Sequence, residues 1–399
     1  MVRQKLNFVM ASFRLFRTQL LVGLFMLIAG AVRIAEAANA DGTNQWKVEF
    51  EGDDVWLKLS SGGSNAFALR LGAGGAVSEI KGGGQSLLSP SFQGEVTDRI
   101  MQWTIWSDTV TNRVASLPKK FEWRFNVTQG GCFDGTISPT TEVWIDAGRG
   151  IVDVYSVPQD QWKTEQREAM RCQLSCLTRY EMKPDGVLLI RRWIRVGDLT
   201  LNGQRTAIAD LQVESWNPFL RRAAAFDAAA LGLDEQGNPT KVHSTGAGFP
   251  HYPKIPADQT AGWAVVFNQH KLTNAPCIVV VFGRENPLSH GGKQELNLMQ
   301  WRDGLAVLPK AVFRNVEPGS VLEHSLVLVF RSRFDARSRD QLNVLAKTIP
   351  PPKLWRPTGE KTRDIVKIAE KLAGNEGVVG MRTEHLGTLI QPDRPPPQK

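Results

Sequence analysis

Cysteine, histidine and tyrosine are scarce in this chain, with four, six and three residues among 399. The cysteines include one C-x3-C spacing, but no second C-x2-C or H-x3-H pair accompanies it, which excludes the common structural zinc motifs. Residues four apart on a strand lie about 13 Å apart, too far for a disulfide between them. Pairing with a more distant cysteine, or burial as free thiols, is therefore expected of Cys132, Cys172, Cys176 and Cys277.

Several catalytic signatures are also missing. The sequence has no D-x-D-x-D or H-E-x-x-H spacing, so no metal site is expected, and it has no G-x-S-x-G elbow. The glycines of residues 72–84 are not followed by Lys-Ser or Lys-Thr, so they do not form a phosphate-binding loop. These absences exclude the corresponding calcium, metalloprotease, hydrolase and nucleotide-binding classes, and they leave any cofactor undefined.

The apolar run at residues 20–32 is only thirteen residues long, about two-thirds of the ~20 needed to cross a bilayer. A basic segment without acids precedes it, and small-x-small cleavage sites follow at residues 35–37 and 38–40. This order predicts a secretory signal peptide over residues 1–40, starting at Met1 or Met10, with a retained anchor as the alternative. We therefore expect a periplasmic or extracellular protein with no stable membrane span after cleavage.

The chain has little net charge once this leader is set aside. The leader holds five of the 48 basic residues and one of the 40 acidic residues, so 43 and 39 remain. No basic cluster with interleaved aromatic residues survives, which argues against a nucleic-acid partner. The remaining positive charge would still attract anionic polymers.

What is present is a long succession of short strands bounded by turns. Most of these runs alternate apolar and polar residues, and glycine, which adopts positive φ at little cost, separates many of them. Residues 184–186, Pro-Asp-Gly, predict a hairpin between two of the longest runs. The pattern indicates an all-β protein with large antiparallel sheets. We expect strands at residues 46–50, 55–59, 66–71, 76–80, 100–106, 121–127, 141–145, 151–157, 171–182, 187–196, 207–216, 263–267, 277–282 and 321–330.

Three segments break this pattern. Residues 219–230 are either a short helix capped by Asn217 or, in part, a strand, and residues 238–259 predict a long Gly- and Pro-rich loop. After residue 334 a proline-rich linker, a helix over residues 360–373 and an extended tail are expected. The expected organisation is a signal peptide at 1–40, a β domain at 41–334 and a C-terminal region at 335–399.

Two passages resemble galactose mutarotase-like proteins and related polysaccharide lyase domains. LRLGAGGAVSEIKGGGQSLLSP at residues 69–90 resembles their early hairpin, and MQWRDGLAVLPKAVFRNVEPGSVLEHSLVLVF at residues 299–330 resembles their late closing segment. The resemblance covers residues 46–334 and implies a large two-sheet β-supersandwich. Mutarotases use a histidine acid and a glutamate base, neither of which can be assigned to a position here. The fold is implied, and mutarotase activity is not.

One loop concentrates residues suited to acid–base chemistry: His243, His251 and Tyr252 lie within ten residues. Histidine titrates near neutral pH, and tyrosine beside a cation can act as a base. A polysaccharide lyase needs such a base and also a positive group that stabilises the developing enolate. Arg99 and Arg167 are candidates for that positive group. The alternative is that this loop packs as a rigid surface segment.

Tryptophan is abundant, with twelve residues, and indole rings pack against the C–H faces of sugars. Trp106 and Trp162 are the candidate sugar contacts, together with Arg167, whereas Trp103 faces the opposite side of its strand from Trp106. The sequence therefore predicts an exported carbohydrate-binding protein, acting on an acidic polysaccharide or sugar as a lyase or epimerase. Its rival is a non-catalytic envelope or matrix scaffold.

Overall fold

The computed structural model forms two units, residues 1–42 and 43–399, and the residues it describes lie in the second. They are 45–356 and 379–382, with gaps at 52–53, 62–63, 89–100, 113–122, 131–137, 139, 161–171, 202–203, 207–208, 217–219, 222–225, 227, 234–238, 245–253, 257–258, 269–275, 285–294, 302–303 and 333–337.

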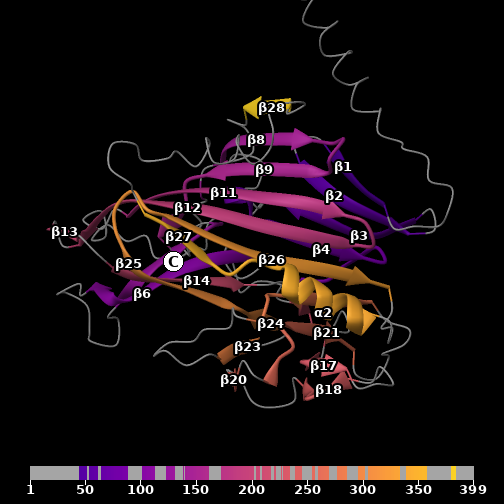
Figure 1. Ribbon diagram of the computed structural model, residues 1–399. Helices are drawn as coiled ribbons and strands as arrows, with labels where there is room; N and C mark the ends of the chain where they lie inside the picture. The colour runs from indigo at the N-terminus through magenta and orange to yellow at the C-terminus, as the bar shows by residue number, and fades with distance from the viewer. Residues whose placement is uncertain are drawn as a thin grey trace, which may run out of the picture. The chain divides into compact units, whose positions relative to one another are not determined.

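A twelve-stranded sheet forms one layer of this unit (Figure 1). Its neighbouring strands are antiparallel, and β12 at its centre pairs with β11 on one side and β26 on the other. Two further strands, β13 (Gln204–Thr206) and β27 (Lys353–Trp355), pair with β12 and β26. In spatial order the other strands are β19 (His243–Ser244), β16 (Ala228–Ala230), β21 (Trp263–Phe267), β22 (Cys277–Val281), β26 (Val321–Arg331), β12 (Val187–Leu201), β11 (Cys172–Lys183), β9 (Ile151–Ser156), β8 (Thr140–Asp146) and β28 (Val379–Arg382).

Three smaller sheets form the opposing layer, and a two-stranded ribbon of β17 (Gly232–Leu233) and β18 (Pro239–Thr240) stands apart. The first contains β1 (Gln45–Glu51), β2 (Asp54–Ser61), β3 (Ser64–Leu71), β4 (Val77–Gly82) and β5 (Gln85–Ser86), with the short 3-10 turn η1 (Ala73–Gly75). The second is β10 (Gln159–Asp160), β7 (Trp123–Thr128), β6 (Gln102–Asn112), β14 (Ala209–Trp216) and β25 (Lys310–Val316). The third is β15 (Leu220–Arg221), β24 (Gly304–Leu308), β23 (Glu295–Trp301) and β20 (Lys254–Pro256).

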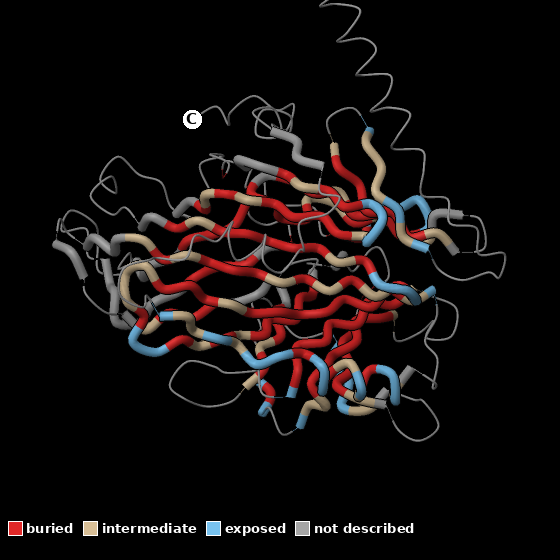
Figure 2. The backbone as a smooth tube through the Cα atoms, turned by 45° about the horizontal axis from the view of Figure 1, so that its top comes forward, coloured by how far each residue is buried: buried red, intermediate tan, exposed pale blue. Residues whose placement is uncertain are grey.

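The hydrophobic core lies between the two layers. Alternate residues of the large sheet, such as Val152, Tyr180 and Ile190, pack against inward-facing residues of β2 and β3 such as Leu57 and Leu69. The buried positions form a continuous band along the central strands (Figure 2). The expected all-β sandwich is therefore confirmed, because the period-two pattern places one face of each strand in this core.

Helix α2 (Ser338–Thr348) covers part of the other side of the large sheet, which we call its outer face (Figure 1). Leu342 and Ala346 of the helix pack on Val279 and Val329 of the sheet. This helix was not expected from the sequence, and the expected helix at residues 360–373 lies outside the described part of the chain. Among the described residues, no helix has the length and apolar character to cross a bilayer.

The structure tests the expectations for residues 219–230 and 238–259, because short strands lie in both segments. In the 219–230 segment β15 and β16 are strands, so the strand alternative holds for these described residues. The expectation of a structureless loop over residues 238–259 was wrong in part, because β18, β19 and β20 lie within it. These strands are only two or three residues long and are held by cross-strand pairing, which sequence alternation cannot reveal over so short a run.

Two turns show why glycine was needed. Asp185 and Gly186 both have positive φ, and together they close the expected hairpin between β11 and β12. Gly74 of η1 has φ +62°, and a Cβ there would lie 1.9 Å from the carbonyl oxygen of Gln129. A Cβ on the next residue, Gly75, would lie 2.7 Å from Val154 of β9, so η1 packs inside the sandwich against the large sheet. The turn at Gly83 and Gly84, by contrast, has open space around it.

Candidate functional site

The outer face of the large sheet is divided into two chemically different parts. Below α2 it is apolar, with Val187, Leu189, Val327 and Val329 in one cluster. Further along the same strands the side chains become charged and aromatic, and we call this region the polar half. It comprises Asp153, Tyr155, Arg179, Arg191, Trp193, Arg195, Glu323, Ser325, Lys353 and Trp355, which share one face by cross-strand register.

A buried ion pair anchors the polar half. Arg179 on β11 lies opposite Asp153 on β9, donating from Nε to Oδ1 over 2.7 Å and from Nη2 to Oδ2 over 2.6 Å. The Arg179 guanidinium also lies 5.9 Å from the ring centre of Trp193, which is fully buried. A two-point arginine–carboxylate contact fixes the guanidinium plane as well as its position. Arg179 is therefore a neutralised, rigid part of the surface.

Arg191 and Arg195 differ from Arg179, because neither forms an ion pair or hydrogen bond with a described residue. They lie on β12 on either side of Trp193, about 13 Å apart by strand geometry. Glu323, opposite Trp193 on β26, is diagonal to both arginines. Two half-buried cations are thus left available to a ligand.

Glu323 instead accepts a hydrogen bond from Trp355 on β27. The indole Nε1 donates to the carboxylate Oε2 over 2.7 Å, and Lys353 lies 3.4 Å from the centre of the indole ring. Trp355 and Tyr155 are half-buried and so can still present part of their rings. Counting the charged side chains, the polar half has four cations and two carboxylates, an excess of two positive charges.

A second polar cluster lies inside the sandwich, on the inner face of β11, β12 and β26. Cys176, Thr178, Arg192 and His324 are all buried there. Gln129 ties this cluster to η1 by donating from Nε2 to the Gly74 carbonyl and to Thr178 Oγ1, both over 3.0 Å.

Burial dominates the acid–base behaviour of this inner cluster. It raises the pKa of the Cys176 thiol to about 12, so the thiolate needed for nucleophilic chemistry is not formed near neutral pH. Burial, reinforced by the positive charge of Arg192, lowers the pKa of His324 to about 3, which keeps that imidazole neutral. Burial also lowers the pKa of Arg192 to about 10. The inner cluster is thus a structural network, closed to a substrate.

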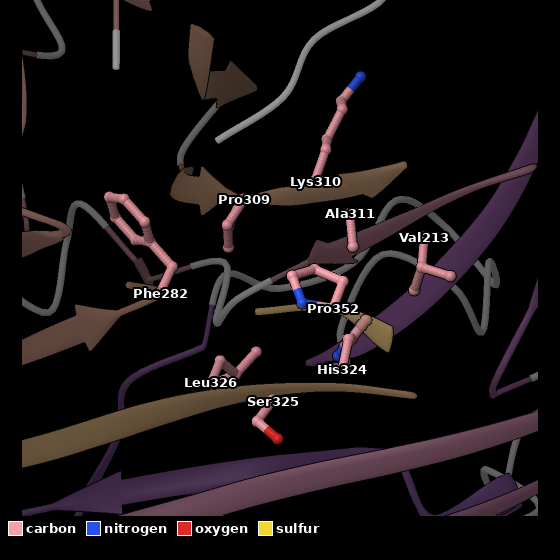
Figure 3. Close-up of a pocket in the computed structure, with 9 residues that line it drawn as sticks. All are labelled: Val213, Phe282, Pro309, Lys310, Ala311, His324, Ser325, Leu326 and Pro352. Atoms are coloured by element: carbon pink, nitrogen blue, oxygen red, sulfur yellow. The ribbon is translucent and has the colours of Figure 1, made fainter. Parts of the chain in front are cut away.

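A small cavity adjoins this cluster, between β26 and the paired strands β14 and β25 (Figure 3). Its lining includes Val213, Phe282, His324 and Pro352, and Lys310 extends away from the other side chains. Its volume of about 20 Å³ has room for one water molecule. Small-molecule pockets typically measure about 300–1,000 Å³, so a sugar ring does not fit in this cavity.

Most of the residues proposed from sequence lie outside the described part of the chain: His251, Tyr252, Arg99, Arg167 and Trp162. His243 is described, half-buried on β19, opposite Ala229. Five strand spacings separate β19 from β12, about 24 Å, so His243 does not lie with the polar half. Trp106 is on β6 in the opposing layer, and its side chain is not described.

The tryptophans and cysteines divide by environment. Apolar alternation in the sequence predicts core positions for Trp123, Trp144, Trp193 and Trp263. Trp193 and Trp263 are buried, as is Trp103, whereas Trp144 is half-buried and the side chain of Trp123 is not described. Cys176 and Cys277 are buried free thiols, one of the two alternatives considered. Across the described residues, no group of three or more His, Cys, Asp or Glu side chains could hold a metal ion.

Sequence reasoning missed the polar half, although its signal is present in VLLIRRWIRV at residues 187–196. Period-two alternation places Arg191, Trp193 and Arg195 on one face of that strand. The cross-strand partners Arg179, Glu323 and Ser325 come from distant segments, and only the strand pairing brings them together.

Comparison with known proteins finds no matching family and no matching curated protein. It does find solved structures. A putative aldose 1-epimerase from Klebsiella pneumoniae has a TM-score of 0.39 and 12% identity over 76% of this chain and 86% of its own. A putative mutarotase from Salmonella typhimurium has a TM-score of 0.38 and 12% identity over 77% of this chain and 100% of its own.

A galactose mutarotase-like protein from Clostridium acetobutylicum has a TM-score of 0.37 and 11% identity over 72% of this chain and 98% of its own. The resemblance expected from the sequence is therefore confirmed, and it is weak and at the level of the fold. Neither the site described above nor its chemistry is drawn from these structures.

Proposed function

We propose that this chain is an exported carbohydrate-binding protein whose sugar-contacting surface is the polar half of the outer face. The observation that carries the proposal is that two cations without a hydrogen-bond or ion-pair partner in the described part of the chain, Arg191 and Arg195, share one face with the half-buried rings of Tyr155 and Trp355. Aromatic faces pack against sugar C–H groups, while charged and polar groups fix orientation. The inner cluster offers no comparable surface, because it is sealed.

We propose an acidic polysaccharide or acidic sugar as the ligand class. The polar half carries an excess of positive charge, and arginine binds carboxylate and sulfate groups through two parallel hydrogen bonds. Neutral glycans would leave Arg191 and Arg195 uncompensated. Binding should therefore weaken as salt concentration rises, because screening reduces attraction between partly exposed charges.

The direct test is calorimetric titration of the mature protein with neutral and acidic oligosaccharides of equal length. Trp355→Ala should weaken binding of the acidic oligosaccharide at least tenfold, since it removes the half-buried ring and the hydrogen bond that this ring donates to Glu323. Arg314→Met is a suitable control, because it removes one positive charge from the opposing layer, where Arg314 of β25 forms an ion pair with Asp210 of β14. Absence of binding to every oligosaccharide would refute the proposal.

A finer proposal is lyase or epimerase chemistry at residues 243–253, with His251 or Tyr252 as base. Its support is the residue chemistry of that loop, and only His243 and Ser244 of it are described. Incubation with acidic polysaccharides, followed by the ultraviolet absorbance of an unsaturated uronate, tests the lyase reaction. His251→Ala should abolish product formation while leaving thermal unfolding unchanged, and a large loss of stability would show that His251 is structural.

Export is supported by the basic start, apolar run and cleavage sites of residues 1–40. N-terminal sequencing of the protein recovered from a secreting host should begin after Ala37 or Ala40. A chain that retains Met1 or Met10 would contradict periplasmic or extracellular localisation by cleavage.

A non-catalytic envelope or matrix scaffold is the second candidate. The burial of Trp56, Trp103 and Trp263 favours it, because these indoles are covered by the protein and cannot contact a glycan. A scaffold would show no saturable binding of any oligosaccharide and would copurify with an envelope protein. The titration described above therefore separates the two functions.

A further inference from the structure

Four hydrogen-bond donor groups of the polar half are buried without an acceptor among the described residues: Arg191 Nε, Arg195 Nε, Trp193 Nε1 and Ser325 Oγ. Burying such a group without a partner costs about 1–3 kcal/mol, and more for a charged one. Native proteins keep few of them. Four such donors on one face of two neighbouring strands are groups that an acceptor-rich ligand would satisfy.

The positions of these groups define where the ligand sits. Ser325 on β26 lies directly opposite Arg191 on β12, so their Cβ atoms are about 5 Å apart. Trp193 follows Arg191 on the same face by two residues, about 6.6 Å along the strand. Arg191, Trp193 and Ser325 are thus neighbours on one face, Glu323 completes the group opposite Trp193, and Arg195 lies one further step along β12.

The chemistry of the donors selects the ligand. Arginine and the indole group are donors only, and the serine hydroxyl both donates and accepts, so the complementary group is rich in acceptors. A water molecule could accept from one or two of them but would not offset the charge of Arg191. Asp153 is already paired with Arg179, directly opposite Arg191, and Glu323, diagonal to Arg191, accepts a hydrogen bond from Trp355, so neither carboxylate forms an ion pair with Arg191 among the described residues.

We propose that Arg191, Trp193 and Ser325 form an oxyanion subsite that binds a carboxylate or sulfate group. Arg195, beyond Trp193 on β12, adds a second positive charge at one end of this subsite. The inference rests on the proposed function, because it assigns the acidic group of the glycan to this position. The same subsite would take a free inorganic oxyanion, and the two sources are distinguished by experiment.

The test measures the binding of sulfate, of an acidic oligosaccharide and of its neutral counterpart to the full mature chain. Chloride at matched ionic strength is the reference for sulfate. The variants are Arg191→Met and Ser325→Ala, with Arg314→Met as a control for loss of one charge. Arg191→Met should fold at least as stably as the unsubstituted protein, because it removes a cation with no partner from beside Arg179.

Sulfate and the acidic oligosaccharide should each bind the unsubstituted protein and Arg314→Met equally, and bind Arg191→Met at least tenfold more weakly. Ser325→Ala should show a smaller loss of the same sign. General stabilisation by sulfate acts on every variant alike, so only the difference between variants counts.

Other outcomes are decisive. Equal binding of neutral and acidic oligosaccharides, unchanged by Arg191→Met, overturns the oxyanion subsite and leaves carbohydrate binding standing. Sulfate binding lost in Arg191→Met, with no oligosaccharide bound, supports the subsite for inorganic oxyanions and overturns the proposed function. Sulfate that acts identically on all variants overturns the subsite.

Discussion

Replacing Asp153 by alanine should destabilise this protein by about 3–5 kcal/mol, the usual cost of removing one partner of a buried ion pair. The side chains of Asp153 and Arg179 are only 9% and 5% exposed, and two short hydrogen bonds join them. Without the carboxylate, the Arg179 guanidinium stays buried and uncompensated. It would also face Arg191 directly across the strand pair, and like charges in that arrangement repel.

The free energy of unfolding is measured by urea titration, with tryptophan fluorescence as the signal. Two double variants make the test specific. Asp153→Leu with Arg179→Met removes both charges at similar volume, so it should recover most of the loss. Adding Arg191→Met to Asp153→Ala should recover part of it, because the repulsion across β11 and β12 disappears. A loss below about 1 kcal/mol for Asp153→Ala, or no recovery in either double variant, would refute the assignment of a buried pair that neutralises Arg179.

Three further predictions concern buried groups of the sandwich. His324 is neutral in the folded protein because burial lowers its pKa to about 3, whereas its pKa in the unfolded chain is near 6.5. Between these pH values the unfolded chain binds more protons, so the free energy of unfolding falls as pH falls. His324→Gln should reduce the slope of the unfolding free energy against pH, between pH 6 and 4, by about 1.4 kcal/mol per pH unit, and an unchanged slope would contradict this. Gly74→Ala should lower the free energy of unfolding, measured in urea, more than twice as much as Gly83→Ala. Both glycines have positive φ, but only at Gly74 does the added Cβ meet a backbone oxygen. Gly83→Ala should lower the free energy of unfolding by about 1–2 kcal/mol, and equal losses would show that η1 is not held against Gln129. Burial raises the pKa of the Cys176 and Cys277 thiols to about 12. Both thiols should therefore resist alkylation in the native protein and react after denaturation, as measured by mass spectrometry. Rapid alkylation of either thiol in the native protein would contradict its burial.

The strands of this fold were predictable from sequence to an unusual extent, because most of them pack one face against a core. The runs at residues 55–59, 151–157 and 321–330 correspond to β2, β9 and β26 within one or two residues. The helix α2 was missed because its apolar stripe is short, at Leu342, Leu345 and Ala346, within a polar segment. The shortest strands, such as β19, were missed because two residues carry no detectable period.

The candidate site was harder to predict, and the doublet Arg191-Arg192 shows why. Alternation establishes that these two arginines point to opposite faces of β12, but not which face is the core, since Ile190 and Ile194 lie on one face and Leu189 and Trp193 on the other. The structure buries Arg192 completely inside the sandwich and leaves Arg191 half-exposed on the outer face. What separates them is tertiary: Gln129, η1 and His324 surround the inner position, whereas Ser325 and Arg179 lie beside the outer one. A strand that carries cations on both faces therefore places one arginine in a buried network between the layers and the other on the face for which we propose anion binding. Only the pairing of β12 with its neighbours assigns each arginine to its face.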